Sequence, residues 1–348
     1  MPNRSRLHAW WVIIGGIAAL VATPACADNL FFKGKTITIT TSAGAGGTHD
    51  VVARVLTRYM SKYLDGHPQM IVQNMPGGGN VLATNYMYAI APKDGTAIAV
   101  VSNVIPLHQV IDKRGVRYDA GQFNWLGSIG GKNDVVFAFR KSGVVTLDDL
   151  KKKELVLGGS GPGSNFIIIP TVMNEVLGTK FKIIMGYKSS HDLFLAMDRG
   201  EIQARDGTYA SIISAYPDWL KDNRLVFFVQ NGIKRDPVLP DVPLLIELAK
   251  TEEERELLTL IASPAPLGQP YLAPPGVASD RVTALRQAFA ASMGDKEFIA
   301  EATKLKVDID LVSADEVTAI VKETVAAPPG VIEKARAVMG PAAGGGGD

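Results

Sequence analysis

The chain has 348 residues, 47% hydrophobic and 20% charged, a composition typical of a globular protein large enough for two domains. Its 36 Lys and Arg nearly balance its 35 Asp and Glu, so no overall charge points to nucleic acid or a membrane surface as a partner. The five His are scattered without the spacing of metal ligands, and we expect neither a metal nor a cofactor.

The first 27 residues have the pattern of a signal peptide. Two arginines give a positive start, residues 9–22 form an apolar run too short to span a bilayer comfortably, and residues 25–27 (Ala-Cys-Ala) fit a small-residue cleavage site. Cleavage before Asp28 would remove the only cysteine, which suits an oxidising exported compartment. We therefore predict a periplasmic protein that lacks residues 1–27. A lipid on Cys26 and an uncleaved anchor are the alternatives.

The mature sequence begins with a predicted strand, a glycine-rich loop and a predicted helix. Residues 36–40 are β-branched and alternate apolar with polar, as a half-buried strand does. An apolar stripe at helical spacing follows over residues 51–64, and Thr48 is the expected N-cap. The glycines leave the backbone N–H groups of residues 45–48 open at the positive end of the helix, which favours a bound phosphate or carboxylate. A tight turn that needs glycine only for close packing is the alternative.

This loop does not fit the common motifs of nucleotide-binding enzymes. The Rossmann pattern begins at Gly44 and Gly46 but has His49 in place of the third glycine, and no P-loop Lys-Ser or Lys-Thr pair follows. A serine hydrolase is also disfavoured, because Ser160 is followed by Pro162 where the G-x-S-x-G motif requires glycine. We therefore predict a binding protein that is not an enzyme, with an exported hydrolase as a weaker alternative.

Strands and helices alternate along the rest of the chain, which predicts an α/β fold. The predicted strands are residues 69–73, 96–101, 134–139, 155–157, 181–185, 202–204, 225–229 and 271–273. The predicted helices are residues 81–91, 191–199 and 244–260, with others opening after residues 146, 279 and 313. Residues 104–125 are expected to cross between two domains, and the glycine-rich residues 341–348 to be disordered.

Two further strands end in glycine-rich loops that lead into helices, at residues 74–80 and 158–165, and a third strand ends at Ser102-Asn103. In open α/β sheets the ligand binds outside the carboxyl ends of the strands. A ligand held by loops of two such domains would lie in the cleft between them.

The order of these segments resembles the substrate-binding receptors of tripartite tricarboxylate transporters, the Bug-type periplasmic proteins. Two of the motifs that carry the resemblance are Gln73-Asn74-Met75-Pro76-Gly77-Gly78-Gly79-Asn80 and Ala91-Pro92-Lys93-Asp94-Gly95-Thr96. The other matching segments are residues 32–35, 46–50, 160–164, 186–188, 198–202, 239–243 and 272–276. The sequence departs from the family near Phe166, where many members have His, at Ser189, where Gly is usual, and around Arg205-Asp206.

The resemblance implies a two-lobe periplasmic binding protein of a type II-like α/β class, in which each lobe is a mixed sheet flanked by helices. Residues 28–126 and 255–340 would form the first lobe, and residues 127–254 the second. The family's function implies a monomeric receptor that holds a small organic acid in the cleft and delivers it to the permease subunits of a tripartite tricarboxylate transporter. A ligand sensor that contacts a signalling protein is the alternative.

The loops and the resemblance together predict the residues that bind the ligand. Asp50 is equally explained as a helix cap, whereas a Tyr such as Tyr187 is more often a packing residue than a ligand contact. The alternatives are an ordinary ion pair for Arg205 and Asp206, and a role only in turns for residues 103, 160 and 164. His49 is expected to be exposed. The candidates are Ala45, Gly46, Gly47, Thr48, Asp50, Asn80, Asn103, Ser160, Gly161, Gly163, Ser164, Asn165, Tyr187, Arg205 and Asp206.

Overall fold

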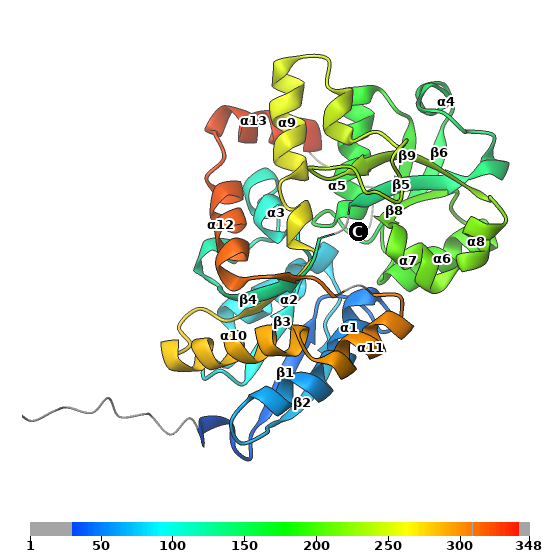
Figure 1. The fold of residues 1–348 in the computed structure, drawn as a ribbon. Helices are drawn as coiled ribbons and strands as arrows, with labels where there is room; N and C mark the ends of the chain where they lie inside the picture. The colour runs from blue at the N-terminus through cyan, green and yellow to red at the C-terminus, as the bar shows by residue number, and fades with distance from the viewer. Residues whose placement is uncertain (1–29, 132, 308, 341–348) are drawn as a thin grey trace, which may run out of the picture.

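The computed structural model describes residues 30–131, 133–307 and 309–340, which form two α/β lobes (Figure 1). The predicted signal peptide and the predicted disordered tail lie outside these residues. Within the described residues, no helix combines the length and the apolar character needed to cross a membrane.

The first lobe is built on a six-stranded mixed sheet in the order β11-β4-β10-β3-β1-β2. β1 pairs in parallel with β2 and β3, whereas β10 runs antiparallel to β3 and β4. The strands are β1 Thr36–Thr41, β2 Gln69–Asn74, β3 Ala97–Val100, β4 Asn124–Ile129, β10 Gln269–Ala273 and β11 Leu311–Val312.

The second lobe is built on a five-stranded mixed sheet in the order β7-β6-β8-β5-β9. β6 pairs in parallel with β7 and β8, and β5 runs antiparallel to β8 and β9. The strands are β5 Asp134–Phe139, β6 Leu155–Gly158, β7 Phe181–Ile184, β8 Ala204–Thr208 and β9 Leu225–Asn231. Both sheets are mixed and flanked by helices, as expected.

Helices flank both sheets (Figure 1). Those of the first half are α1 Thr48–Met60, α2 Val81–Ala89, α3 Ile105–Ile111, α4 Leu147–Lys152, α5 Asn165–Val172 and α6 Ser190–Arg199. Those that follow are α7 Tyr209–Ala215, α8 Pro217–Lys221, α9 Glu252–Ala262, α10 Ser279–Met293, α11 Lys296–Lys304, α12 Ala314–Val325 and α13 Pro329–Met339.

The division of the chain at residues 126 and 254 stays a prediction, and three observations bear on it. β4 continues in the first sheet to Ile129, and the second sheet begins at Asp134. α9 and α13 pack in the same hydrophobic core as α5 and strands β5 and β6 of the second lobe. Figure 1 shows α13 beside α9, so this last described helix lies against the second lobe.

Several local expectations were wrong. The segment 104–125 contains helix α3 and the start of β4, and Pro106 in the first turn of α3 is compatible with a helix because that turn needs no donor there. The expected helix 244–260 is a 3₁₀ turn over Leu245–Leu248 followed by α9. α1 has Gly47 as its N-cap, and Thr48 is already inside the helix.

The strand expected at residues 202–204 instead spans Ala204–Thr208, which includes two charged residues and a glycine. These residues have low β-propensity, but the strand is central in its sheet and is paired on both sides. Tertiary pairing therefore overrides local propensity, and Arg205 and Asp206 lie on a strand and not in the loop after it.

Candidate ligand-binding site

A cavity of about 760 Å³ lies between the two lobes. Most of the predicted binding residues line it, but Ala45, Asp50, Gly161, Gly163 and Asp206 do not. The predicted residues in its wall are Gly46, Gly47, Thr48, Asn80, Asn103, Ser160, Ser164, Asn165, Tyr187 and Arg205.

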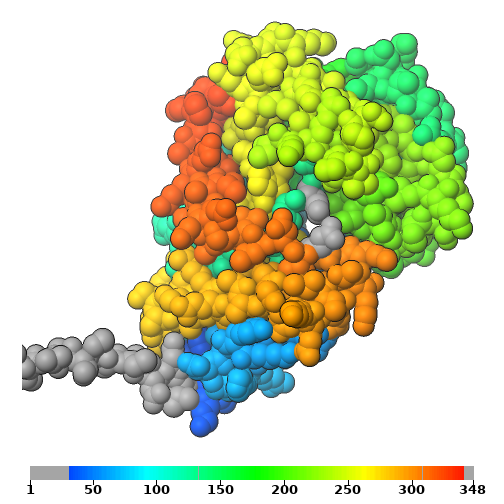
Figure 2. Space-filling model, viewed as in Figure 1, coloured from blue at the N-terminus to red at the C-terminus, as the bar shows by residue number. Residues whose placement is uncertain are grey.

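The lobes contact each other at two places beside this cavity. On one side the backbone N–H of Gly44 donates to the carbonyl oxygen of Lys188 at 3.2 Å. On another, the Ser214 hydroxyl donates to the carbonyl oxygen of Leu305 at 3.2 Å, where Figure 2 shows the orange chain after α11 against the green second lobe. The two lobes are therefore in direct contact beside the cavity.

The glycine-rich loop before α1 is held by Asp50. Gly46 donates its backbone N–H to the Asp50 carboxylate at 2.9 Å, and the N–H of Gly47 donates to the carbonyl oxygen of Gly44 at 3.2 Å. Two of the four amides expected to hold a carboxylate therefore already have acceptors. Of the other two, Ala45 does not line the cavity, whereas Thr48 does, and no acceptor reaches its N–H in the described structure. The N–H of His49, which also lines the cavity from the first turn of α1, likewise has no acceptor there, so both residues offer a donor to a ligand.

The second and third glycine-rich loops touch each other through their backbones. Gly79 has a φ of +65°, and a Cβ atom there would lie 2.7 Å from both the carbonyl oxygen of Gly161 and the backbone nitrogen of Gly163. A Cβ on Gly161 would in turn lie 2.6 Å from the nitrogen of Gly79. Glycine is needed at these positions because the backbone of a loop from one lobe directly contacts the backbone of a loop from the other, which leaves no room for a Cβ atom. Gly161 and Gly163 thus lie at a contact between the lobes.

The hydroxyl of Ser164 is also used inside the protein. It donates to the carbonyl oxygen of Gly161 at 2.9 Å, and Ser164 is the N-cap of α5. In this arrangement the hydroxyl proton is used inside the protein, and the assignment of Ser164 as a ligand-binding residue stays a prediction.

A chain of side-chain amides joins the lobes at the cavity. Asn103, from the first lobe, donates to the carbonyl oxygen of Pro264 at 3.2 Å and accepts from Asn165 at 3.3 Å. The same Asn165 amide nitrogen contacts the carboxylate of Asp134, at the start of β5. Both asparagines were predicted, but Asp134 was not, because an acidic residue opening an apolar strand gave no indication of its neighbours.

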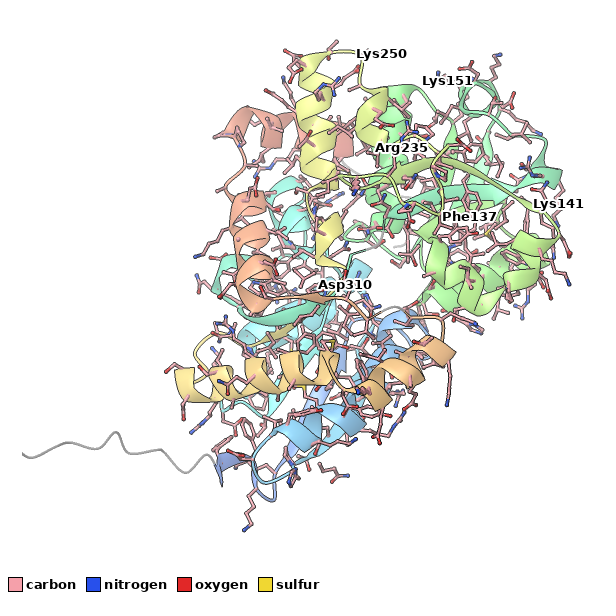
Figure 3. The ribbon with its side chains drawn as sticks, in the orientation of Figure 1. Phe137, Lys141, Lys151, Arg235, Lys250 and Asp310 are labelled. Atoms are coloured by element: carbon pink, nitrogen blue, oxygen red, sulfur yellow. The ribbon has the colours of Figure 1, made fainter. Side chains whose placement is uncertain are left out.

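Arg205 lies in the cavity wall with its side chain fully buried, on the face of the second sheet where aromatic side chains pack. Its guanidinium carbon lies 4.0 Å from the ring centre of Phe194, 5.4 Å from that of Phe166 and 5.8 Å from that of Phe137, which Figure 3 labels in the second lobe. It donates to the hydroxyl of Ser190 at 2.8 Å and to the Ser190 carbonyl oxygen at 2.9 Å. Burial lowers the pKa of Arg205 to about 10, so the side chain stays charged at neutral pH.

Asp206 follows Arg205 on the strand and therefore points to the opposite face of the sheet. It is fully buried, and within the described residues neither carboxylate oxygen has a hydrogen-bond partner. Burial, and then the nearby Asp134, raise the pKa of Asp206 well above its usual range. No ion pair within 4.0 Å joins Arg205 and Asp206 in the described chain, so the alternative explanation of these two residues, an ordinary ion pair, does not apply.

The sequence missed several residues of the cavity wall. His49, expected to be exposed, is partly buried there, and burial lowers its pKa to about 4, so its ring is neutral at pH 7. Phe166 and Phe194 add apolar surface from α5 and α6. Residues 305–307 reach the wall from the chain after α11, which no local pattern could have indicated.

Comparison with known proteins places the chain in a family. The model of the tripartite tricarboxylate transporter family receptor matches residues 52–336, most of the chain. The chain belongs to this receptor family.

A relative of this receptor is the UPF0065 protein in the gbd 5' region of Cupriavidus necator, 26% identical over 331 residues that cover 92% of this chain and 95% of the relative. The periplasmic binding protein BugD has a similar structure, with a TM-score of 0.70 and 19% identity over 88% of this chain and 98% of BugD. MatC of Rhodopseudomonas palustris with bound malate gives a TM-score of 0.68 and 18% identity over 88% of this chain and 99% of MatC. These likenesses establish the fold.

The receptor's cavity is surrounded by the N-terminal ends of helices from both lobes. Thr48 and His49 of α1 and Asn80 at the start of α2 line it from the first lobe, and Asn165 of α5 and Ser190 of α6 line it from the second. Helix N-termini present unpaired N–H groups and a partial positive charge, so they bind anions. In the described chain, no group of three His, Cys, Asp or Glu side chains gathers as a metal site.

Proposed function

We propose that the protein is a periplasmic receptor that binds a small organic carboxylate between its lobes and delivers it to a tripartite tricarboxylate-type membrane transporter. One observation carries the proposal: the N-termini of α1, α2, α5 and α6 meet at a single cavity between two lobes in contact. That arrangement supports capture of an anion by lobe closure.

The relatives support the chemistry of this proposal. Solved structures of the family's fold include one with bound malate and one from R. palustris with adipate, the latter at a TM-score of 0.66 and 19% identity over 87% of this chain and 97% of that one. Hydrogen bonds to a charged group contribute about 1.5–3 kcal/mol each. Three or four of them, less the cost of closing the lobes, allow micromolar affinity, about −8 kcal/mol.

A thermal-shift screen against mono-, di- and tricarboxylates, aromatic acids and amino acids tests the binding step. We expect at least one acid to raise the melting temperature without being converted, and calorimetry to give one site per chain. Turnover of that acid would contradict the receptor function. Failure of every acid to bind would contradict the carboxylate site.

Delivery and export need separate tests. Vesicles that contain the membrane subunits should take up the acid only when the loaded receptor is added; binding without uptake would favour the sensor function. Intact-mass analysis of periplasmic protein should give a chain that starts at Asp28. A mass that includes Met1, or a lipid on Cys26, would contradict the predicted cleavage.

A further inference from the structure

A buried carboxylate lies in a cavity otherwise suited to anions. Asp134 opens β5 and lines the cavity, where only 8% of the residue remains exposed. The amide of Asn165 contacts one oxygen, Oδ2, and within the described chain no donor reaches the other, Oδ1. Oδ1 is not among the fully buried oxygens that lack a partner, and Asp134 lines the cavity, so this oxygen is open to a donor from the ligand. A carboxylate that is mostly removed from water is stabilised by such a partner.

Among the described residues, Arg205 and Asp206 are the charged groups that act on Asp134, and neither supplies that donor. The side chain of Arg205 lies on the face of the second sheet opposite to that of Asp134, as its contact with Phe137 shows. Its nitrogens donate to Ser190 and to the backbone oxygen of Asp206. No nitrogen of Arg205 is within 4.0 Å of the Asp134 carboxylate in the described structure. Asp206 lies diagonally across from Asp134 on the same face of the sheet, because its direct partner on β5 is Val136. Asp206 is a carboxyl group whose pKa is raised by burial, and in neither protonation state does it offer a positive charge.

The helix N-termini and Asp134 together favour a ligand that carries one negative and one positive charge. A carboxylate is favoured at the N-termini of α1 and α5, but a second carboxylate within about 4 Å of Asp134 would be repelled by roughly 4 kcal/mol at an effective dielectric constant of 20. A protonated amine at the same place would instead form a charge-assisted hydrogen bond. The site therefore discriminates by attraction to one charge and repulsion of the other.

We propose that the ligand is a zwitterionic acid, with its carboxylate at the helix N-termini and a protonated amine bound to Oδ1 of Asp134. This inference rests on the proposed function, because it assigns the ligand class of the same cavity. Burial raises the pKa of Asp134 to about 6, so the group is ionised at neutral pH even before an amine lowers that value further.

Pairs of acids that differ only in the amine test this proposal. Calorimetry compares aspartate with succinate, glutamate with glutarate, and phenylalanine with 3-phenylpropionate. We expect the wild-type protein to bind the best amino acid at least tenfold more tightly than its partner without the amine. Asp134→Asn should remove that preference. The affinity for the amino acid should fall at least tenfold, and the affinity for the acid without an amine should change by less than threefold.

A matched control is Asp198→Asn, which removes the same charge from an exposed position of α6 in the same lobe and should change neither affinity. Circular dichroism should show both variants folded. If the acids without an amine bind as tightly as their partners, or if Asp134→Asn weakens both members of a pair equally, the amine assignment is wrong and the carboxylate receptor stands. If no acid binds, both proposals are wrong.

Discussion

The backbone N–H of Gly46 donates a 2.9 Å hydrogen bond to the carboxylate of Asp50, one helical turn further along the chain. The other carboxylate oxygen accepts from Asn74 at 2.8 Å and pairs with Arg54 at 2.8 Å. Asp50 therefore joins the glycine-rich loop to α1 and to the end of β2, and it shapes the cavity without lining it.

Asp50→Asn should lower the free energy of unfolding by about 1.5–3 kcal/mol, because it removes charge-assisted hydrogen bonds from a buried group. Ligand affinity should fall as well, since the loop loses its anchor. Urea denaturation and calorimetry measure the two effects. Asp65→Asn, at an exposed position, is the control and should stay within about 0.5 kcal/mol of wild type. Equal stability of the two variants would show that Asp50 does not hold the loop.

Gly79→Ala should oppose lobe closure. The new Cβ would lie 2.7 Å from backbone atoms of Gly161 and of Gly163, which is closer than a Cβ comes to atoms it is not bonded to. We expect at least tenfold weaker ligand binding and a larger radius of gyration by small-angle scattering with ligand present.

Gly200→Ala is the matched control for this variant. Gly200 also has a positive φ, of +79°, but a Cβ there would meet nothing within 4 Å. Both variants thus carry the backbone strain of about 1–2 kcal/mol, and only Gly79→Ala adds the contact between lobes. Equal affinity and equal radius for the two variants would show that the glycine contact does not govern closure.

Asp134→Asn should stabilise the ligand-free protein at pH 7.5 and not at pH 4. The pKa of Asp134 is raised by burial from 3.8 to about 6, so between these values the folded chain binds a proton that the unfolded chain has lost. Stability therefore falls as pH rises through this range, by roughly 2–3 kcal/mol in total. Urea denaturation at both pH values, without ligand, measures the difference. The same gain at both values would contradict this titration.

Arg205→Lys should destabilise the second lobe by about 2–4 kcal/mol although it keeps the charge. Lysine cannot stack flat against Phe194 or donate in a fork to Ser190, as the guanidinium does. Arg199→Lys, at a side chain that is 67% exposed, is the control and should have almost no effect. Thermal and urea denaturation should separate the two variants. If they do not, the contacts of Arg205 contribute little to stability.

Much of the fold followed from local patterns. The strand-loop-helix at residues 36–60 was predictable because its β-branched run, its glycines and its apolar stripe each indicate the same structure. α3 was not, because Pro106 near its start resembled a break in the chain. β8 was not predicted in full either, because only pairing with β5 and β6 makes Arg205 to Thr208 extended.

The position of the glycine-rich loops at the candidate site was predictable from the sequence. The hydrogen-bond partners of their amides and hydroxyls were not. The glycine-rich loops lie at the cavity as expected, since strand ends gather at one edge of each sheet. Which amides remain open depends on Asp50, and whether Ser164 can donate depends on Gly161. Which acceptor takes each donor is determined only in the folded chain. The surroundings of Asp134 also depend on the fold, because its neighbours come from α5, β8 and β9.

The opposite orientation of Arg205 and Asp206 also protects the second sheet from mispairing. Side chains alternate between the faces of a strand, so a shift of β8 by one residue against β5 would exchange the two. It would place the carboxylate among the rings of Phe137 and Phe194 and the guanidinium among the aliphatic residues around Val136. Neither group would find its present surroundings there, so these two charged residues in the centre of the sheet oppose a shift of β8 by one residue.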